Sequence, residues 1–119
     1  MLKRSKGFTL LEIMVVVMLI GMLAVLAIPN FLISRETARM NTCLNNLRQL
    51  DFAKVQMVME HRIGLGEAID PDELVQYLKG LKMPVCPASG TYDIGDIDQP
   101  AACSYESDRF PHALSPDNP

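Results

Sequence analysis

The stretch Gly7-Phe8-Thr9-Leu10-Leu11-Glu12 opens an apolar run that extends from Phe8 to Ile28. Thirteen of the 21 residues in this run are Leu, Ile, Val or Phe, and a helix of this length crosses the hydrocarbon core of a bilayer. On the membrane-insertion scale these side chains contribute roughly −4 to −8 kcal/mol, against about +3 kcal/mol for the single carboxylate of Glu12. The run therefore predicts a membrane-spanning helix that contains one acid.

The residues before the run include three basic side chains, Lys3, Arg4 and Lys6. By the positive-inside rule they hold the N-terminus in the cytoplasm and direct the C-terminal part outward. A secretory signal peptide also begins with positive charge, but its apolar segment is about 7–15 residues long and ends in a small-x-small cleavage site, for which Ala24 and Ala27 are spaced wrongly. A plain single-span anchor is a further alternative. It gives no reason for Glu12, because acids inside membranes generally have a function and a partner.

Residues 6–12, Lys-Gly-Phe-Thr-Leu-Leu-Glu, resemble the N-terminal motif of type IV pilins and type II secretion pseudopilins. The resemblance implies that a prepilin peptidase cleaves between Gly7 and Phe8 on the cytoplasmic side, and that the new Phe8 amine is N-methylated. It also implies that Glu12 pairs with the Phe8 amine of a neighbouring subunit during filament assembly. Electrostatics requires such a partner, because removing one member of a buried ion pair costs about 3–5 kcal/mol.

The same resemblance implies a structural subunit of a type IV pilus or a type II secretion pseudopilus. A membrane-anchored enzyme is a further alternative, but the sequence has no nucleophile, metal or phosphate motif, so no enzymatic activity, catalytic residue or cofactor is expected. The expected partners are copies of the chain or other pilins in a filament, the prepilin peptidase and the inner-membrane assembly machinery. The expected location is the inner membrane, as a single-pass protein, and then a pilus or a periplasmic pseudopilus. The alternative is a minor pilin that acts as an adhesin or a DNA-uptake component.

The charge of the chain argues against direct contact with nucleic acid. The formal net charge is −3, and without residues 1–7 only eight basic side chains oppose 14 acidic ones. Binding to a phosphate backbone needs clustered Lys and Arg. No direct nucleic-acid partner is therefore expected.

Gly21 in the apolar run and Pro29 directly after it resemble helix breakers that the family often has and that let this segment partly unwind in a filament. Pro29 lacks an amide proton and disfavours a helical Ile28, so local chemistry also predicts a kink. Residues 30–62 contain no Gly or Pro, and their apolar residues recur at helical spacing, which predicts an amphipathic continuation of the helix. The predicted apolar face consists of Met40, Cys43, Leu44, Leu47, Leu50, Val55 and Val58.

Asp51 and Lys54 interrupt that face three residues apart. We expect them to be able to pair with each other at a solvated edge of the helix.

The predicted organisation is a basic leader at 1–7, a transmembrane or filament-core helix at 8–29, the amphipathic helix at 30–62, a small globular head at 63–106 and a flexible tail at 107–119. In the head, Asp70 as N-cap and Pro71 at the first position predict a short helix to about Lys79. Its residues Leu74, Tyr77, Leu78 and Leu81 are expected to cover the long helix. Residues 86–94 and 101–105 predict a β-hairpin. The fold class is α+β, a long kinked N-terminal helix packed against this head.

The chain has three cysteines. Cys86 and Cys103 stand at the two ends of the predicted hairpin, and a bridge between them would contribute roughly 3 kcal/mol on the chain-entropy estimate. We therefore predict a Cys86–Cys103 disulfide, which suits an oxidising compartment. Cys43 is expected to be a buried thiol rather than a bridged or reactive one. The cysteines show no paired metal-ligand spacing.

The remaining polar candidates are two histidines and one acidic cluster. His61 and His112 lie in different segments without a Ser or Cys at motif spacing, so they are expected at the surface and outside any catalytic site. Asp93, Asp96 and Asp98 are weak calcium candidates, because pseudopilins that the chain resembles carry a calcium site in a C-terminal loop. Turn chemistry explains the same residues, since Asp favours turns for backbone reasons.

Overall fold

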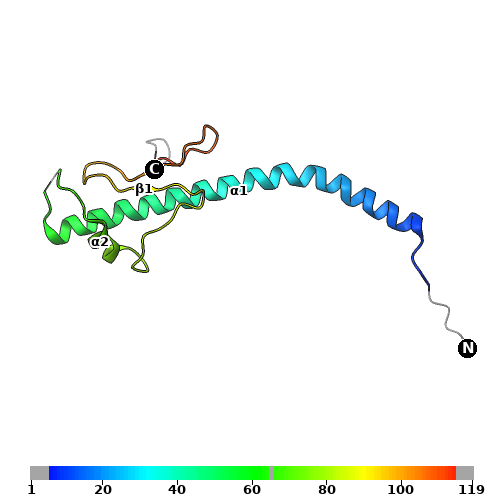
Figure 1. The fold of residues 1–119 in the computed structure, drawn as a ribbon, viewed down its shortest axis with the longest axis horizontal. Coiled ribbons are helices and arrows are strands. Elements are labelled where there is room, and N and C mark those ends of the chain that lie inside the picture. The colour runs from blue at the N-terminus through cyan, green and yellow to red at the C-terminus, as the bar shows by residue number, and fades with distance from the viewer. Residues whose placement is uncertain (1–5, 65, 115–119) are drawn as a thin grey trace, which may run out of the picture. The chain divides into compact units, whose positions relative to one another are not determined.

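The computed structural model describes residues 6–64 and 66–114, so most of the leader expected at 1–7 and the end of the tail expected at 107–119 lie outside the described residues. The elements are helix α1 (Leu10–His61), helix α2 (Pro71–Leu74), the 3-10 helix η1 (Val75–Tyr77), and strands β1 (Tyr92–Asp93) and β2 (Ala102–Cys103) (Figure 1). The predicted α+β class, with one long N-terminal helix, is confirmed.

Helix α1 is a single element of 52 residues and contains Pro29 in its interior. The chain forms two compact units, which divide after Arg35. The first unit holds the apolar half of α1, and the second holds the amphipathic half with the head. The helical assignment continues through Gly21 and Pro29, so the kink at these residues stays a prediction.

The core of the second unit lies between the amphipathic half of α1 and the head. Four residues of the predicted apolar face are buried as expected, namely Cys43, Leu44, Leu47 and Leu50. Val55, which is expected on the buried face, is instead 51% exposed, whereas Lys54 beside it is 3% exposed. The reason is tertiary: backbone carbonyl groups of the loop between β1 and β2 contact the Lys54 amine. Ala53 and Met57 complete the buried face of the helix.

Helix α2 begins as the sequence predicts and ends earlier. The Asp70 side chain accepts a hydrogen bond of 3.0 Å from the backbone N–H of Asp72, and Pro71 occupies the first helical position. The α-helix stops at Leu74, continues as η1 to Tyr77, and is followed by extended backbone at Leu78. Leu74 and Leu78 are buried against α1.

Leu81 was expected to cover the long helix and is instead 69% exposed. The helix has already ended before it, and Gly80 and Leu81 both have positive φ, of 89° and 51°. These angles turn the chain away from the helical path.

The predicted β-hairpin is present, with strands of two residues each. The strands are antiparallel, with Tyr92 opposite Cys103 and Asp93 opposite Ala102. A hairpin this short is not stable by itself. Its position therefore depends on side-chain contacts with α1.

Candidate functional site

The N-terminal motif forms the first turn of α1. Thr9 Oγ1 accepts a hydrogen bond of 3.3 Å from the backbone N–H of Glu12, and Thr9 O accepts one of 3.3 Å from the backbone N–H of Ile13. Thr9 is thus the N-cap, and Thr9 with Glu12 has the spacing of a capping box, Thr-x-x-Glu. The helix therefore begins at Leu10, two residues after Phe8, which is 81% exposed.

The motif thus has a second role, as the N-terminal cap of α1, for which the Thr-x-x-Glu spacing is the only signal in the sequence. A carboxylate in the first turn also interacts favourably with the partial positive charge of the helix N-terminus. Among residues 6–64 and 66–114, the Glu12 carboxylate has no hydrogen-bond or ion-pair partner. Its negative charge remains available for an intermolecular partner.

The apolar half of α1 exposes its side chains in every direction. All large hydrophobic residues from Phe8 to Ile33 are at least 41% exposed. The helix is long and apolar enough to cross a membrane by length and composition, with a mean hydropathy of 2.8 over its most apolar window. Soluble monomers rarely expose an apolar surface this large, so it needs lipid or other protein chains around it.

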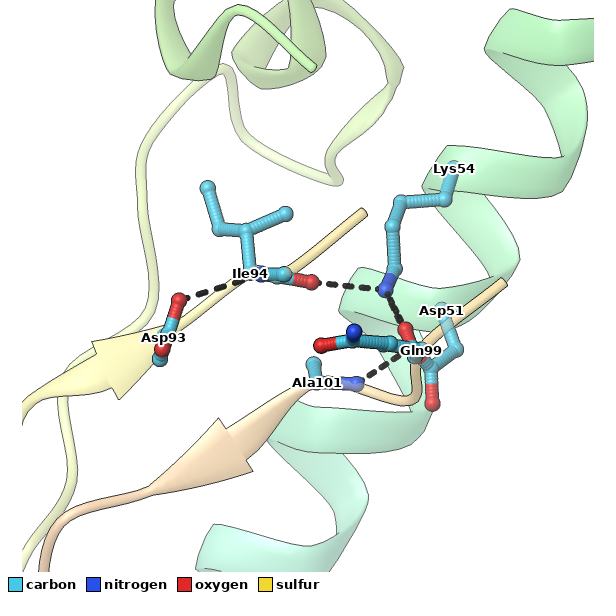
Figure 2. A network of polar contacts seen from close by, with 7 residues as sticks. Asp51, Lys54, Asp93, Ile94, Gln99 and Ala101 are labelled. Carbon is cyan, nitrogen blue, oxygen red and sulfur yellow. Dashed lines mark hydrogen bonds and ion pairs between the residues drawn. The ribbon is translucent and has the colours of Figure 1, made fainter. Parts of the chain in front are cut away.

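Asp51 and Lys54 clamp the loop between the two strands onto α1 (Figure 2). The Lys54 amine lies 3.1 Å from Asp51 Oδ1 and donates hydrogen bonds of 2.7 Å to the backbone carbonyls of Ile94 and Gln99. Asp51 Oδ1 also accepts a hydrogen bond of 2.9 Å from the backbone N–H of Ala101. The proposed pairing of the two side chains is present, but the expected solvated edge is wrong, because the head buries Lys54.

The acidic cluster at Asp93, Asp96 and Asp98 has turn contacts. Asp93 Oδ1 accepts a hydrogen bond of 3.1 Å from the backbone N–H of Gly95, and the Asp96 carbonyl accepts one of 3.2 Å from the N–H of Gln99. These contacts agree with the turn explanation of the three acids. Calcium binding at this loop stays untested.

The two histidines differ in their exposure to solvent. His61 is exposed, as expected, and its Nε2 lies 2.9 Å from the Tyr77 hydroxyl. The expected surface position is wrong for His112, which is 2% exposed. Its ring packs against Tyr105 with the centroids 4.6 Å apart. This packing holds part of the segment that the sequence assigned to a flexible tail against the head.

The three cysteines and His112 come together in the head. The Sγ atoms of Cys43, Cys86 and Cys103 and one ring nitrogen of His112 all lie within 4.8 Å of one another. All three cysteines are free in the structure, and the Cys86–Cys103 disulfide stays a prediction. Cys43 is buried, as expected, but it faces the other two thiols. Sequence spacing did not reveal this cluster, because its members come from segments far apart in the chain.

The surroundings of the cluster raise the pKa of one member and lower the pKa of two others. Burial raises the pKa of the Cys43 thiol to about 12, while a hydrogen bond from the Tyr92 hydroxyl opposes that rise. Burial also acts to raise the pKa of Cys86, but hydrogen bonds from the backbone N–H groups of Ala88 and Gly90 help to lower it overall. Burial lowers the pKa of His112, which favours the neutral imidazole with a free lone pair.

The N-terminal part of the chain matches a known family motif. Residues 2–28 match the prokaryotic N-terminal methylation motif. The chain is 40% identical over 57 residues to the type IV major pilin protein PilA of Myxococcus xanthus (strain DK1622), covering 48% of this chain and 26% of that protein. It is 42% identical over 52 residues to the type II secretion system core protein G of Klebsiella pneumoniae, covering 44% and 37% of the two chains.

A similar match is the type II secretion system core protein G of Escherichia coli (strain K12), with 42% identity over 50 residues, 42% of this chain and 34% of that protein. The matched segments thus span between 26% and 37% of the length of these relatives. No solved structure matches the chain. The resemblance drawn from residues 6–12 is confirmed: this chain carries the prepilin-type methylation motif, and its matching relatives are a type IV pilin and core proteins of type II secretion systems.

Proposed function

We propose that this protein is a structural subunit of a type IV pilus or a type II secretion pseudopilus, assembled through α1. The observation that carries the proposal is the methylation motif at the start of a helix whose apolar side chains are exposed all round. Before assembly, lipid covers this surface in a single-pass inner-membrane protein. In the filament, the same helices of neighbouring subunits cover it.

Maturation supplies the partner for Glu12. Cleavage between Gly7 and Phe8 removes the basic leader and creates an N-terminal amine on Phe8, which is then methylated but keeps its positive charge. This amine of one subunit pairs with the Glu12 carboxylate of its neighbour. The exposed Phe8 and the unpaired carboxylate support this pairing, because an isolated charge in lipid costs about 3 kcal/mol.

The matched relatives favour the structural subunit over the adhesin or DNA-uptake alternative, since they are a major pilin and core secretion proteins. The abundance of the chain in sheared surface filaments distinguishes a structural subunit from a minor adhesin or DNA-uptake component. A dominant band supports the structural subunit, and a trace amount supports a minor component.

The test of assembly is Glu12→Gln in the native host, which removes the charge and keeps the shape of the side chain. We expect the variant to reach the membrane and to lose residues 1–7, as mass spectrometry of the intact chain would show, but to be absent from filaments. Glu12→Asp keeps the charge and should assemble in part. Glu106→Gln, an exposed acid on the head, is the matched control. Wild-type amounts of filament from Glu12→Gln would contradict the pairing.

A further inference from the structure

The four side chains of the cluster come from four separate segments of the head unit. Cys43 lies on α1, Cys86 in the turn that follows Val85, Cys103 at the end of β2, and His112 in the C-terminal segment. We propose that these four side chains bind one zinc ion in a closed, tetrahedral Cys3His site. The site goes beyond the proposed function, because it lies in the second unit and not in the apolar half of α1 that the filament buries.

The distances suit one ion. Zinc has four ligands in structural sites, with Zn–S bonds of about 2.3 Å and Zn–N bonds of about 2.0 Å, so a sulfur and a nitrogen of one tetrahedron lie about 3.5 Å apart. Cys86 Sγ and His112 Nδ1 are 3.5 Å apart. The remaining ligand atoms lie within 4.8 Å of one another, and small side-chain rotations close such a set around a single ion.

The donor atoms select zinc. Thiolate sulfur and imidazole nitrogen in tetrahedral geometry are the ligands of structural zinc sites, whereas calcium and magnesium take oxygen ligands. Cys43, Cys86 and His112 are at most 3% exposed. With four protein ligands and this burial the ion has no open position for water or substrate, so the site is structural rather than catalytic.

Neighbouring residues orient the ligands. The Tyr92 hydroxyl interacts with the Cys43 thiol and accepts a hydrogen bond of 3.0 Å from Asn46 Nδ2. Tyr105 packs against the His112 ring. Such outer contacts fix the orientation of metal ligands and contribute to affinity.

Gly90 provides space for a ligand. A Cβ atom at this position would lie 2.6 Å from Cys103 Sγ and 2.9 Å from Tyr105 Cβ. The backbone of the Cys86 turn therefore approaches the Cys103 sulfur so closely that only glycine fits. This approach holds Cys103 near Cys86.

A metal accounts for the cluster better than the predicted disulfide. A Cys86–Cys103 bridge uses two of the four groups and leaves the buried Cys43 thiol and the His112 nitrogen without a role. His112 Nδ1 points at a cysteine sulfur, and its Nε2 has no hydrogen-bond partner among residues 6–64 and 66–114. A zinc ion uses all four groups and links α1, the Cys86 turn, the hairpin and the C-terminal segment.

The test uses the full chain, purified in detergent and kept reduced with a phosphine. We expect elemental analysis to find one zinc per chain after zinc is added and excess metal is removed. Replacing zinc by cobalt(II) should give the thiolate charge-transfer band and the visible bands of a tetrahedral cobalt site. Absence of bound zinc in the reduced wild-type chain would overturn the proposal, and so would recovery of iron in its place.

Two ligand variants, Cys103→Ser and His112→Gln, should each lower zinc affinity at least 100-fold. His61→Gln, at an exposed histidine outside the cluster, is the matched control and should bind zinc like the wild type. Zinc retained by both ligand variants at wild-type affinity would contradict the assignment. If a variant fails to fold, the cobalt spectrum of the wild-type chain still decides, because an octahedral spectrum without a thiolate band excludes a Cys3His site.

Discussion

Lys54 Nζ lies 3.1 Å from Asp51 Oδ1, three residues earlier on α1, and the pair holds the loop between β1 and β2 against the helix. Lys54→Met keeps the apolar stem and removes the amine, so the carbonyls of Ile94 and Gln99 lose their donor and the Asp51 carboxylate loses its ion-pair partner. We expect a loss of about 3 kcal/mol in the free energy of unfolding of the head. Denaturant unfolding of the purified wild-type and variant chains measures this change in the free energy of unfolding.

The control for this change is Lys79→Met, at an exposed lysine, which should alter stability by less than about 0.5 kcal/mol. Equal effects of the two substitutions would show that the Lys54 contacts are not stabilising.

Gly90→Ala should destabilise the head by about 2 kcal/mol, because the added methyl group overlaps Cys103 Sγ and Tyr105 Cβ. Gly64→Ala is the control, since nothing lies within 4 Å of a Cβ at that position. Thermal unfolding of the two variants side by side compares them. A stable Gly90→Ala protein would mean that the Cys86 turn lies further from Cys103.

Asp70→Ala should lower the free energy of unfolding by about 1 kcal/mol, because the backbone N–H of Asp72 loses its acceptor at the start of α2. Asp70→Asn keeps an acceptor oxygen and should be nearly neutral. Unfolding midpoints of the two variants give the comparison. A similar loss in both would assign the effect to the charge of Asp70 rather than to its hydrogen bond.

Tyr92→Phe removes the hydroxyl that interacts with the Cys43 thiol and leaves the ring in place. If the cluster binds zinc, this variant should bind it 10- to 100-fold more weakly, which is about the usual effect of losing an outer contact. Competition with a chromogenic chelator measures the affinity. Tyr77→Phe, at a tyrosine that contacts His61, should leave zinc affinity unchanged.

Removing the metal should destabilise the head and leave the helical content of the apolar segment unchanged. A ligand that binds only the folded state at 100 times its Kd stabilises that state by about 2.7 kcal/mol. A chelator should therefore lower the unfolding temperature of the zinc-loaded chain, and added zinc should restore it. An unfolding temperature that does not respond to either would contradict a structural metal.

Local patterns in the sequence predicted the elements of this fold. The apolar run predicted the first half of α1, and helical spacing predicted burial of Leu44, Leu47 and Leu50. Asp70 and Pro71 predicted the start of α2. These features depend on residues a few positions apart, so the sequence shows them directly. The motif at residues 6–12 likewise predicted the resemblance to pilins, which the match of residues 2–28 to the prokaryotic N-terminal methylation motif confirms.

Only the tertiary structure decided what lies beside the second half of α1. Helical spacing does not reveal that the carbonyls of residues 94 and 99 accept hydrogen bonds from Lys54. It therefore predicts a buried Val55 and a Lys54 at a solvated edge of the helix. Nor can spacing say that Cys43, Cys86, Cys103 and His112 converge, because 42 residues separate the first two along the chain. Local hydrogen bonding and hydrophobic periodicity determine helices and turns, whereas a cluster assembled from four segments depends on how those segments pack.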